Sequence, residues 1–229
     1  MHLQYRGKKM KKLVIFDLDG TLLNTIADLG NSTNYALERL GYPIHDIPSY
    51  CFRVGNGINK LFERALPEGS QTEANVLKVR KFFMEYYNLH CADETHPYPG
   101  IPQLLEALQG RGISMAVASN KYQEASSILM RHYFPNIPFV AVFGQRDGIE
   151  RKPNPAVVFE IMKIARVNAS DVLYVGDSGV DMETALNAGV TACGVTWGFR
   201  PESELQKFHP AYVVDSPEAI LSLLDKENA

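Results

Sequence analysis

Two kinds of hydrophobic pattern alternate along most of this chain. Short continuous runs rich in Val and Ile occur at residues 13–16, 113–118, 139–143, 172–175, 191–195 and, more weakly, 212–214. Such runs are typical of strands buried on both faces of a parallel sheet. Helical periodicity lies between them, at residues 101–110, 122–133, 155–166, 179–188 and 216–224. The alternation predicts an α/β fold: a doubly wound, Rossmann-like, mostly parallel sheet with right-handed crossovers.

One long interval departs from this alternation. From about residue 26 to residue 90 the pattern predicts only helices, over residues 26–40, 57–65 and 72–90. Gly and Pro residues separate these helices. We therefore expect a discontinuous α/β core, residues 10–24 and 93–229, with an inserted helical cap domain of residues 25–92. Residues 1–9 are expected to form an N-terminal extension.

Composition and charge narrow the class of protein. The 229 residues carry 23 Lys and Arg against 26 Asp and Glu, a net charge of −3, which argues against a nucleic-acid partner. No apolar run approaches the roughly 20 residues that a membrane helix needs. The three cysteines, Cys51, Cys91 and Cys193, form no CxxC pair, so neither zinc nor a disulfide framework is supported. We expect a cytoplasmic protein, monomeric or homodimeric, without a membrane or nucleic-acid partner.

The first predicted strand ends in the segment Asp-Leu-Asp-Gly-Thr, residues 17–21. In open α/β sheets ligands bind beyond the carboxyl ends of the strands, so this segment lies where a site is expected. Asp17 and Asp19 are two residues apart and share a face of an extended chain. Two close carboxylates favour either a hard-cation site or a nucleophile beside a proton carrier. Gly20 allows the chain to leave the strand in a tight turn.

Polar groups also stand at three further predicted strand ends or helix starts. Ser119 and Asn120 supply a hydroxyl and an amide, Lys152 supplies one cation, and Asp177 and Asp181 supply two more acids. Each alone has a simpler explanation, such as a turn, a solvated lysine or stabilisation of a helix dipole. Asp181 in particular could contact a metal directly or only stabilise its helix. Together they predict a phosphoryl-transfer site around a divalent cation.

These segments resemble the motifs of a known family. Residues 17–21, Ser119, Lys152 and residues 176–181 match, in order and spacing, the four motifs of the haloacid dehalogenase superfamily of phosphotransferases. The helical interval resembles the mobile cap of that superfamily. Within it, the chain is most similar to phosphoglycolate phosphatase-type hydrolases, through Gly176-Asp177-Ser178, residues 53–57 and Thr196-Trp197-Gly198.

The resemblance implies a two-step phosphoryl transfer. Asp17 would attack phosphorus and form an aspartyl-phosphate, while Asp19 would protonate the leaving alkoxide and then take a proton from water. Ser119 and Lys152 would hold the transferring phosphoryl oxygens. Two further residues would contribute to phosphate binding: Thr21 and Asn120.

The resemblance also implies a Mg²⁺ cofactor. Its ligands would be the side chains of Asp17 and Asp177 and the backbone carbonyl of Asp19. Asp181 would act indirectly, through a bound water or by orienting a ligand. The second acid, Asp19, disfavours carbon–halogen cleavage, because an alkoxide leaving group, unlike a halide, benefits from an acid.

Specificity is expected to come from the cap. Arg53 lies beside a Gly55-x-Gly57 turn that precedes a predicted helix, an arrangement suited to a carboxylate or second phosphate. An exposed capping turn with solvated charges is an equal alternative.

The sequence thus favours a Mg²⁺-dependent phosphatase acting on a small phosphorylated metabolite, with phosphoglycolate as the first candidate. Thr21 favours a hydrolase over a mutase. The alternatives are a phosphosugar mutase of the β-phosphoglucomutase type, a pyrophosphatase or nucleotidase, and a non-enzymatic phosphate-binding module.

Overall fold

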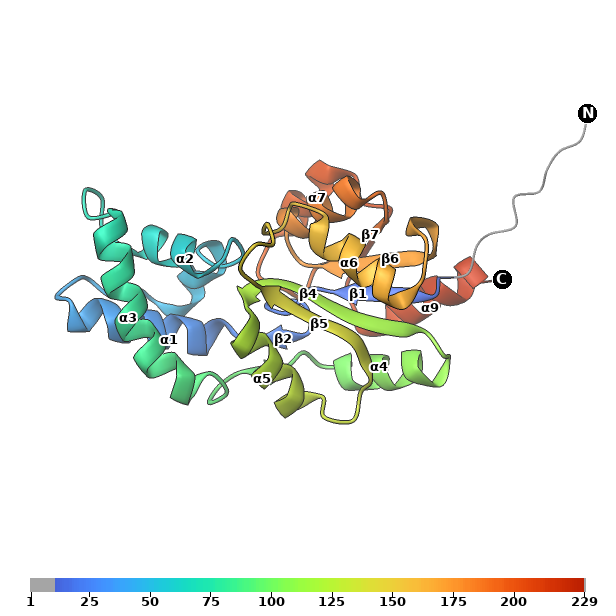
Figure 1. Cartoon of the computed structure of the whole chain (residues 1–229), viewed down its shortest axis with the longest axis horizontal. Coiled ribbons are helices and arrows are strands. Elements are labelled where there is room, and N and C mark those ends of the chain that lie inside the picture. The colour runs from blue at the N-terminus through green and yellow to red at the C-terminus, as the bar shows by residue number, and fades with distance from the viewer. Residues whose placement is uncertain (1–10, 229) are drawn as a thin grey trace, which may run out of the picture.

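The computed structural model describes residues 11–228 and contains a six-stranded sheet in which all neighbouring strands are parallel (Figure 1). The strand order is β5-β4-β1-β6-β7-β8. The strands are β1 (Leu13–Phe16), β4 (Ser114–Tyr122), β5 (Phe139–Gln145), β6 (Val172–Gly176), β7 (Thr191–Val195) and β8 (Tyr212–Val214). The doubly wound parallel fold is therefore confirmed. The predicted N-terminal extension, residues 1–9, lies outside the described residues.

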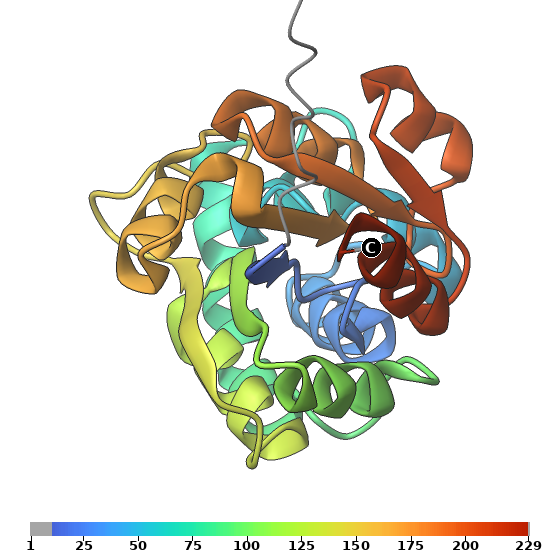
Figure 2. The ribbon, with the colours of Figure 1, turned by 90° about the vertical axis from the view of Figure 1, so that its right-hand side faces the viewer.

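Helices cover both faces of the sheet (Figure 2). They are α4 (Ile101–Gly110), α5 (Gln123–Tyr133), α6 (Ala156–Ala165), α7 (Gly179–Ala188) and α9 (Pro217–Asn228). Val14 and Phe16 pack in the hydrophobic cluster that contains residues of α4, α5 and α9, whereas Leu13 and Ile15 pack against α6 and α7. Because successive strand residues point to opposite faces, β1 must be apolar at every position, as the sequence pattern indicated.

β1 lies in the middle of the sheet, between β4 and β6. The chain moves from β1 to β4 and β5 on one side, then returns to β6, β7 and β8 on the other. The strand order therefore reverses at β1, and the carboxyl ends of β1, β4 and β6 meet at one edge of the sheet. Ligand sites of open α/β sheets lie at such a point.

A small antiparallel ribbon connects the sheet to the helical interval. Strands β2 (Leu23–Asn24) and β3 (His96–Pro97) pair with each other, and the chain between them forms helices to one side of the sheet (Figure 1). These helices are α1 (Ile26–Arg39), η1 (Ile47–Phe52), α2 (Ile58–Ala65) and α3 (Glu73–His90). The ribbon is not predicted by the sequence pattern, because strands of two residues are too short to show a period of two. The division into a core and a cap domain of residues 25–92 stays a prediction. We call residues 25–92 the helical segment.

The helical segment has aromatic packing of its own, and hydrogen bonds hold its first helix to the chain that returns to the sheet. The rings of Phe62 and Phe83 are 5.0 Å apart, and those of Phe83 and Tyr87 are stacked at 4.9 Å. At the base, the buried carboxylate of Asp28 accepts hydrogen bonds from the backbone amides of Glu94, at 3.0 Å, and Thr95, at 2.8 Å. These bonds join α1 to the returning chain and compensate the cost of burying the charge.

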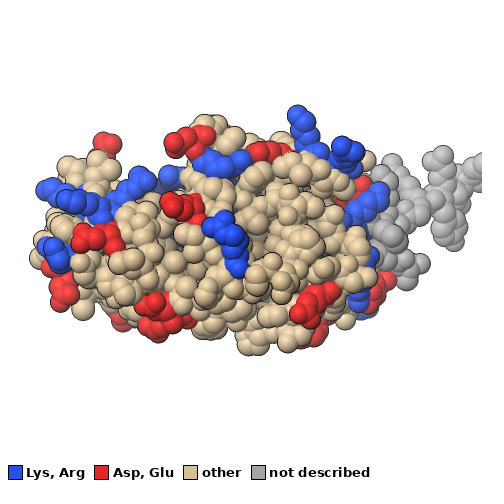
Figure 3. Space-filling view, turned by 60° about the horizontal axis from the view of Figure 1, so that its bottom comes forward, with Lys and Arg blue, Asp and Glu red and all other residues tan. Residues whose placement is uncertain are grey.

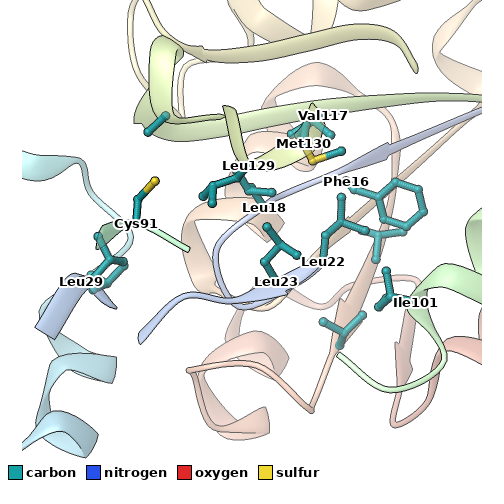
Figure 4. Packing of buried hydrophobic residues seen from close by; sticks show 14 of the residues in the cluster. Phe16, Leu18, Leu22, Leu23, Leu29, Cys91, Ile101, Val117, Leu129 and Met130 are labelled. Carbon is teal, nitrogen blue, oxygen red and sulfur yellow. The ribbon is translucent and has the colours of Figure 1, made fainter. Parts of the chain in front are cut away.

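Apolar side chains from the sheet, the ribbon and the helical segment lie close together near the end of β1. Figure 4 shows Phe16, Leu18 and Leu22 beside Val117 and Met130, with further apolar residues around them. This packing fixes the chain on either side of the Asp17–Thr21 turn, so the turn is held on a rigid base.

Three short helical turns complete the described elements: η2 (Ala169–Asp171), α8 (Glu202–Leu205) and η3 (Gln206–Phe208). Within the described residues no helix is both long and apolar enough to cross a membrane. On the face that Figure 3 shows, Lys and Arg are interspersed with Asp and Glu.

Candidate active site

The turn after β1 brings Asp17 against the end of β6. The amide of Asp17 donates to the carbonyl of Val175, at 2.9 Å. Gly20 has a φ of +89°, and a Cβ atom there would lie 2.3 Å from an oxygen of Asp177. Only glycine fits this left-handed conformation and close approach. Gly20 therefore allows the carboxylates of β1 and β6 to come together.

Lys152 is buried between two carboxylates. Its Nζ lies 2.9 Å from Oδ1 of Asp17 and 2.7 Å from Oδ1 of Asp181, and its side chain is 3% exposed. Burial alone would lower the pKa of Lys152, but Asp17 and Asp181 raise it well above its usual value. The ammonium group therefore stays charged. It fixes Oδ1 of Asp17 in place.

Three buried acids, Asp17, Asp177 and Asp181, have carboxylate oxygens within 4.8 Å of one another. Burial and then the charge of Asp181 raise the pKa of Asp17 to about 7, and the same two causes raise the pKa of Asp177 well above its usual value. Like charges confined in a poorly solvated site favour either protons or a cation. The cluster therefore fits a hard metal ion, whose preferred ligands are carboxylate and carbonyl oxygens.

Asp181 is the member of this cluster least available to a metal. Its Oδ1 accepts from Lys152 and, at 3.3 Å, from the hydroxyl of Tyr174. Its Oδ2 accepts from the backbone amide of Ser178 at 3.2 Å and from the hydroxyl of Ser178 at 2.6 Å. Because both of its oxygens are engaged, Asp181 caps the start of α7 and orients Lys152. Of the two predicted roles, this favours the one in which Asp181 does not contact the metal directly.

Asp177 is held by the chain around it. The hydroxyl of Thr21 donates to Oδ1 at 3.3 Å, and the backbone amide of Phe199 donates to Oδ2 at 2.7 Å. The indole of Trp197 in turn donates to the carbonyl of Thr21, at 3.0 Å. Thr21, for which the sequence predicts a phosphate contact, is fully buried, and its hydroxyl bond orients Asp177.

β4 extends four residues beyond its apolar run, to Tyr122, so Ser119 and Asn120 lie within the strand rather than after it. The amide of Asn120 donates to the carbonyls of Gly55, at 3.0 Å, and Lys152, at 3.1 Å, and its oxygen accepts from the amide of Lys152. Asn120 thus joins the helical segment to the Lys152 loop. Ser119 lines the pocket described below.

Lys121 is the main functional candidate that sequence analysis missed. Its Nζ lies 3.1 Å and 3.4 Å from the two oxygens of Asp19, and its side chain is only 3% exposed. The hydroxyl of Thr25 also donates to Asp19, at 2.8 Å. The period of two along a strand places Lys121 on the same side as Ser119, and this spacing was the signal available in the sequence.

Arg53 is not brought to this group of residues. Its guanidinium donates to the carbonyl and hydroxyl oxygens of Ser49, both at 2.8 Å, and lies over the ring of Tyr50. A second contact, at 3.3 Å, joins it to the ring of His45. Arg53 therefore fastens the loop that precedes α2, which matches the capping alternative more closely than the anion site.

Asp17, Asp19 and Ser119 line a pocket whose empty space, including the part open to solvent, is about 510 Å³. Asp17 and Asp19 lie on one side with residues 119–122 of β4. The opposite wall belongs to the helical segment and is mostly apolar, formed by Leu29, Val54, Gly55, Gly57, Ile58, Leu61 and Phe83. Two carboxylates and a hydroxyl thus face a largely apolar chamber between the sheet edge and the helices.

Comparison with known proteins agrees with this geometry. A sequence model of the haloacid dehalogenase-like hydrolases matches residues 14–195. The chain is 34% identical over 219 residues to the phosphoglycolate phosphatase of Vibrio parahaemolyticus, covering 93% of this chain and 96% of that protein. It is also 34% identical to the phosphoglycolate phosphatase of Pseudomonas savastanoi, over 90% of this chain and 77% of the relative.

Solved structures share the whole fold. One crystal structure from Lactobacillus delbrueckii superposes with a TM-score of 0.88 at 33% identity, covering 94% of this chain and 99% of that one. A predicted phosphoglycolate phosphatase from Haemophilus somnus gives a TM-score of 0.87 at 28% identity, covering 94% and 98%. The chain therefore belongs to the haloacid dehalogenase-like hydrolase family and is a phosphoric monoester hydrolase.

Proposed function

We propose that this protein is a Mg²⁺-dependent phosphatase that hydrolyses a small anionic phosphomonoester through an aspartyl-phosphate, with phosphoglycolate as the first candidate. The observation that carries the proposal is the buried Lys152–Asp17 pair beside Asp177, opening into the same pocket as Asp19. The names of the relatives from Vibrio and Pseudomonas support the choice of substrate.

The proposed reaction uses Asp17, Asp19, Ser119 and Lys152. An oxygen of Asp17 attacks phosphorus and the bond to the ester oxygen breaks, while Asp19 gives its proton to that oxygen. Asp19 then takes a proton from water, which attacks the aspartyl-phosphate and releases phosphate. Lys152 and the hydroxyl of Ser119 hold the phosphoryl oxygens as their charge develops.

A Mg²⁺ ion suits the donors found here, because hard cations prefer oxygen ligands. The proposed ligands are the carboxylates of Asp17 and Asp177 and the backbone carbonyl of Asp19. When bound, the ion supplies positive charge that offsets the negative charge of the phosphoryl group and the acids. The side chain of Asp19 is not one of the clustered acids, since its carboxylate contacts Lys121 and Thr25.

We expect Mg²⁺ to stabilise the protein more above neutral pH than below it. The pKa of Asp17, raised by burial to about 7, means that the metal-free folded state binds a proton more tightly than the unfolded chain does. Its stability therefore falls as the pH rises from about 4 through 7, and bound Mg²⁺ offsets that loss. At about a hundredfold excess over Kd, Mg²⁺ should raise Tm by roughly 5–10 °C at about pH 8, and by clearly less at about pH 5.5.

The measurement is thermal unfolding with MgCl₂ or with NaCl of equal ionic strength. Asp177→Asn is the control for site binding, and the Mg²⁺-dependent rise in Tm should be largely lost in that variant. An equal rise at both pH values would contradict the assignment of the acid cluster as the binding site.

Asp19→Asn tests the proposed proton transfer. An alkoxide leaving group needs a proton, whereas the nitrophenolate of p-nitrophenyl phosphate leaves without one. We expect kcat with phosphoglycolate to fall by about 10²–10⁴-fold, the usual contribution of a general acid. With p-nitrophenyl phosphate the fall should be much smaller. Single-turnover rates with both substrates measure this, and equal losses would exclude Asp19 as the acid.

The proposed function as a whole is tested by a phosphate-release screen over phosphorylated metabolites with Mg²⁺. The proposal expects the highest kcat/KM with a small anionic phosphomonoester. The same panel separates the alternatives: pyrophosphate and nucleotides give phosphate directly, and β-glucose-1-phosphate with a bisphosphate activator gives an isomer detectable by NMR. A preference for any of these would replace the proposal.

A further inference from the structure

We propose that Lys121, on the sheet side of the pocket, binds the carboxylate of the substrate and selects phosphate esters of short 2-hydroxy acids. The inference rests on the proposed phosphatase function and extends it by naming the group that recognises the leaving alcohol. It also moves specificity from the helical segment, where the sequence led us to expect it, to β4 of the sheet.

The pocket wall carries little positive charge. Among the described residues that line the pocket, Lys121 is the only Lys or Arg. The phosphoryl group has Lys152, which contacts Asp17 and Asp181 and lies outside the lining. A second anionic group on the substrate would therefore meet a single cationic side chain, and the remaining wall is largely apolar. Such surroundings exclude water and strengthen an ion pair.

Lys121 has hydrogen-bonding capacity beyond its contact with Asp19. An ammonium group has three donors. Within the described part of the chain, the hydrogen bonds of Lys121 Nζ go to one carboxylate only, that of Asp19. Its other close neighbour is the ring of Tyr87, whose centroid is 5.0 Å away and which offers a π-face instead of a lone pair. Lys152, in contrast, is shared by two carboxylates.

Lys121 also lies close enough to Asp19 to contact a short leaving group. Asp19 protonates the ester oxygen in the proposed reaction, so that oxygen must lie within hydrogen-bond distance of the Asp19 carboxylate. In a 2-hydroxy acid phosphate the carboxylate carbon is two covalent bonds, about 3 Å of chain, from the ester oxygen. Lys121 Nζ lies 3.1 Å from Asp19 Oδ1. A carboxylate on the first carbon of the leaving group is therefore within reach of Lys121.

Two phosphonates with matched shapes test the inference without turnover. 3-Phosphonopropionate is phosphoglycolate with its ester oxygen replaced by CH₂, and propylphosphonate carries a methyl group in place of the carboxylate. The wild-type protein with saturating Mg²⁺ should bind the first about ten- to a hundredfold more tightly by calorimetry, as expected for a charge-assisted hydrogen bond. Lys121→Met should lose most of that preference, while its affinity for propylphosphonate changes by about twofold or less.

Two further variants keep the comparison sharp. Lys78→Met removes an exposed lysine of α3 and should retain the wild-type preference. Lys121→Gln retains an amide that can bond to Asp19 without a charge, so it replaces the Met variant if that protein does not fold. In the kinetic version, Lys121→Met should raise KM for phosphoglycolate at least about tenfold and leave KM for ethyl phosphate nearly unchanged.

The results that would overturn the inference differ from those that would overturn the proposed function. Equal binding of both phosphonates by the wild-type protein overturns the inference. A preference for 3-phosphonopropionate that survives in Lys121→Met or Lys121→Gln also overturns it, and would point to the N-terminus of α2 as the carboxylate site. An equal loss of both ligands would mean that Lys121 only supports Asp19 and would also overturn it. Failure of the proposed function has a different signature: no phosphomonoester is turned over, whatever the phosphonates do.

Discussion

Asp17→Asn is expected to reduce phosphatase turnover by at least about 10⁴-fold, because an amide oxygen cannot act as the nucleophile that forms the aspartyl-phosphate. The structure leaves little room for a substitute. Lys152 fixes one Asp17 oxygen at 2.9 Å, and Asp17 lines the pocket with Asp19 and Ser119. Asp181 has both oxygens engaged by other groups. The measurement is phosphate release at saturating substrate and Mg²⁺.

A lost nucleophile must be distinguished from a lost fold. Asn has nearly the shape of Asp, and it removes a buried acid whose pKa is raised by burial and by the charge of Asp181. Tm in EDTA should therefore not fall. Asp215→Asn, a matched change at an exposed position after β8, should leave both turnover and Tm unchanged. Turnover within about tenfold of the wild type in Asp17→Asn would contradict nucleophilic catalysis by this residue.

The parts of the fold that could be predicted are those where one local pattern has one physical cause. The apolar runs at residues 13–16 and 191–195 coincide with β1 and β7, because strands covered on both faces must be apolar throughout. Helix α7 matches its predicted span, Gly179–Ala188, where Ser178 and the αL residue Gly189 mark the ends. Placing the acids at strand ends then followed from the general rule for open sheets.

The side-chain partners inside the site could not be predicted, because they join residues far apart in sequence. Lys121 meets Asp19 across 102 positions, and Asn120 meets Gly55 across 65. Neither partner changes the local pattern around the other. Ser119 and Asn120 were placed after a strand because polarity ended the apolar run, although β4 pairs with β5 again at Tyr122, beyond an irregularity that follows Ala118. A strand that enters a polar site loses its hydrophobic signal before it loses its hydrogen bonds.

The two buried lysines have complementary positions around the carboxylates of the site. Lys152 lies behind the nucleophile and is neutralised by Asp17 and Asp181, whereas Lys121 lies beside Asp19, the proposed acid. A charge buried with two opposite partners chiefly fixes geometry, while one with a single partner retains capacity for a ligand. This difference separates the expected effects of substituting them: loss of Lys121 should alter substrate selection, and loss of Lys152 should alter both turnover and stability.

Lys152→Met should lower the free energy of unfolding by about 3–5 kcal/mol at about pH 8 in EDTA, the usual cost of leaving buried charges unpaired. The raised pKa of Lys152 means that its ammonium is fully present in the folded wild-type protein at this pH. In the variant, Asp17 and Asp181 remain buried without it, and Asp17, whose pKa burial already raises to about 7, can lose its charge by protonation. The loss should therefore shrink at about pH 5.5, because the folded variant then binds protons that the unfolded chain holds less tightly.

Urea denaturation at the two pH values, with and without Mg²⁺, measures this effect. Mg²⁺ should recover part of the lost stability at about pH 8, but turnover should stay at least about 10²-fold below wild type, since an oriented cation at the phosphoryl group is missing. Lys163→Met, at an exposed position of α6, is the matched control. A stability loss of the same size at both pH values would show that Lys152 contributes packing, and the charge-based account of the Asp17–Lys152–Asp181 group would then be wrong.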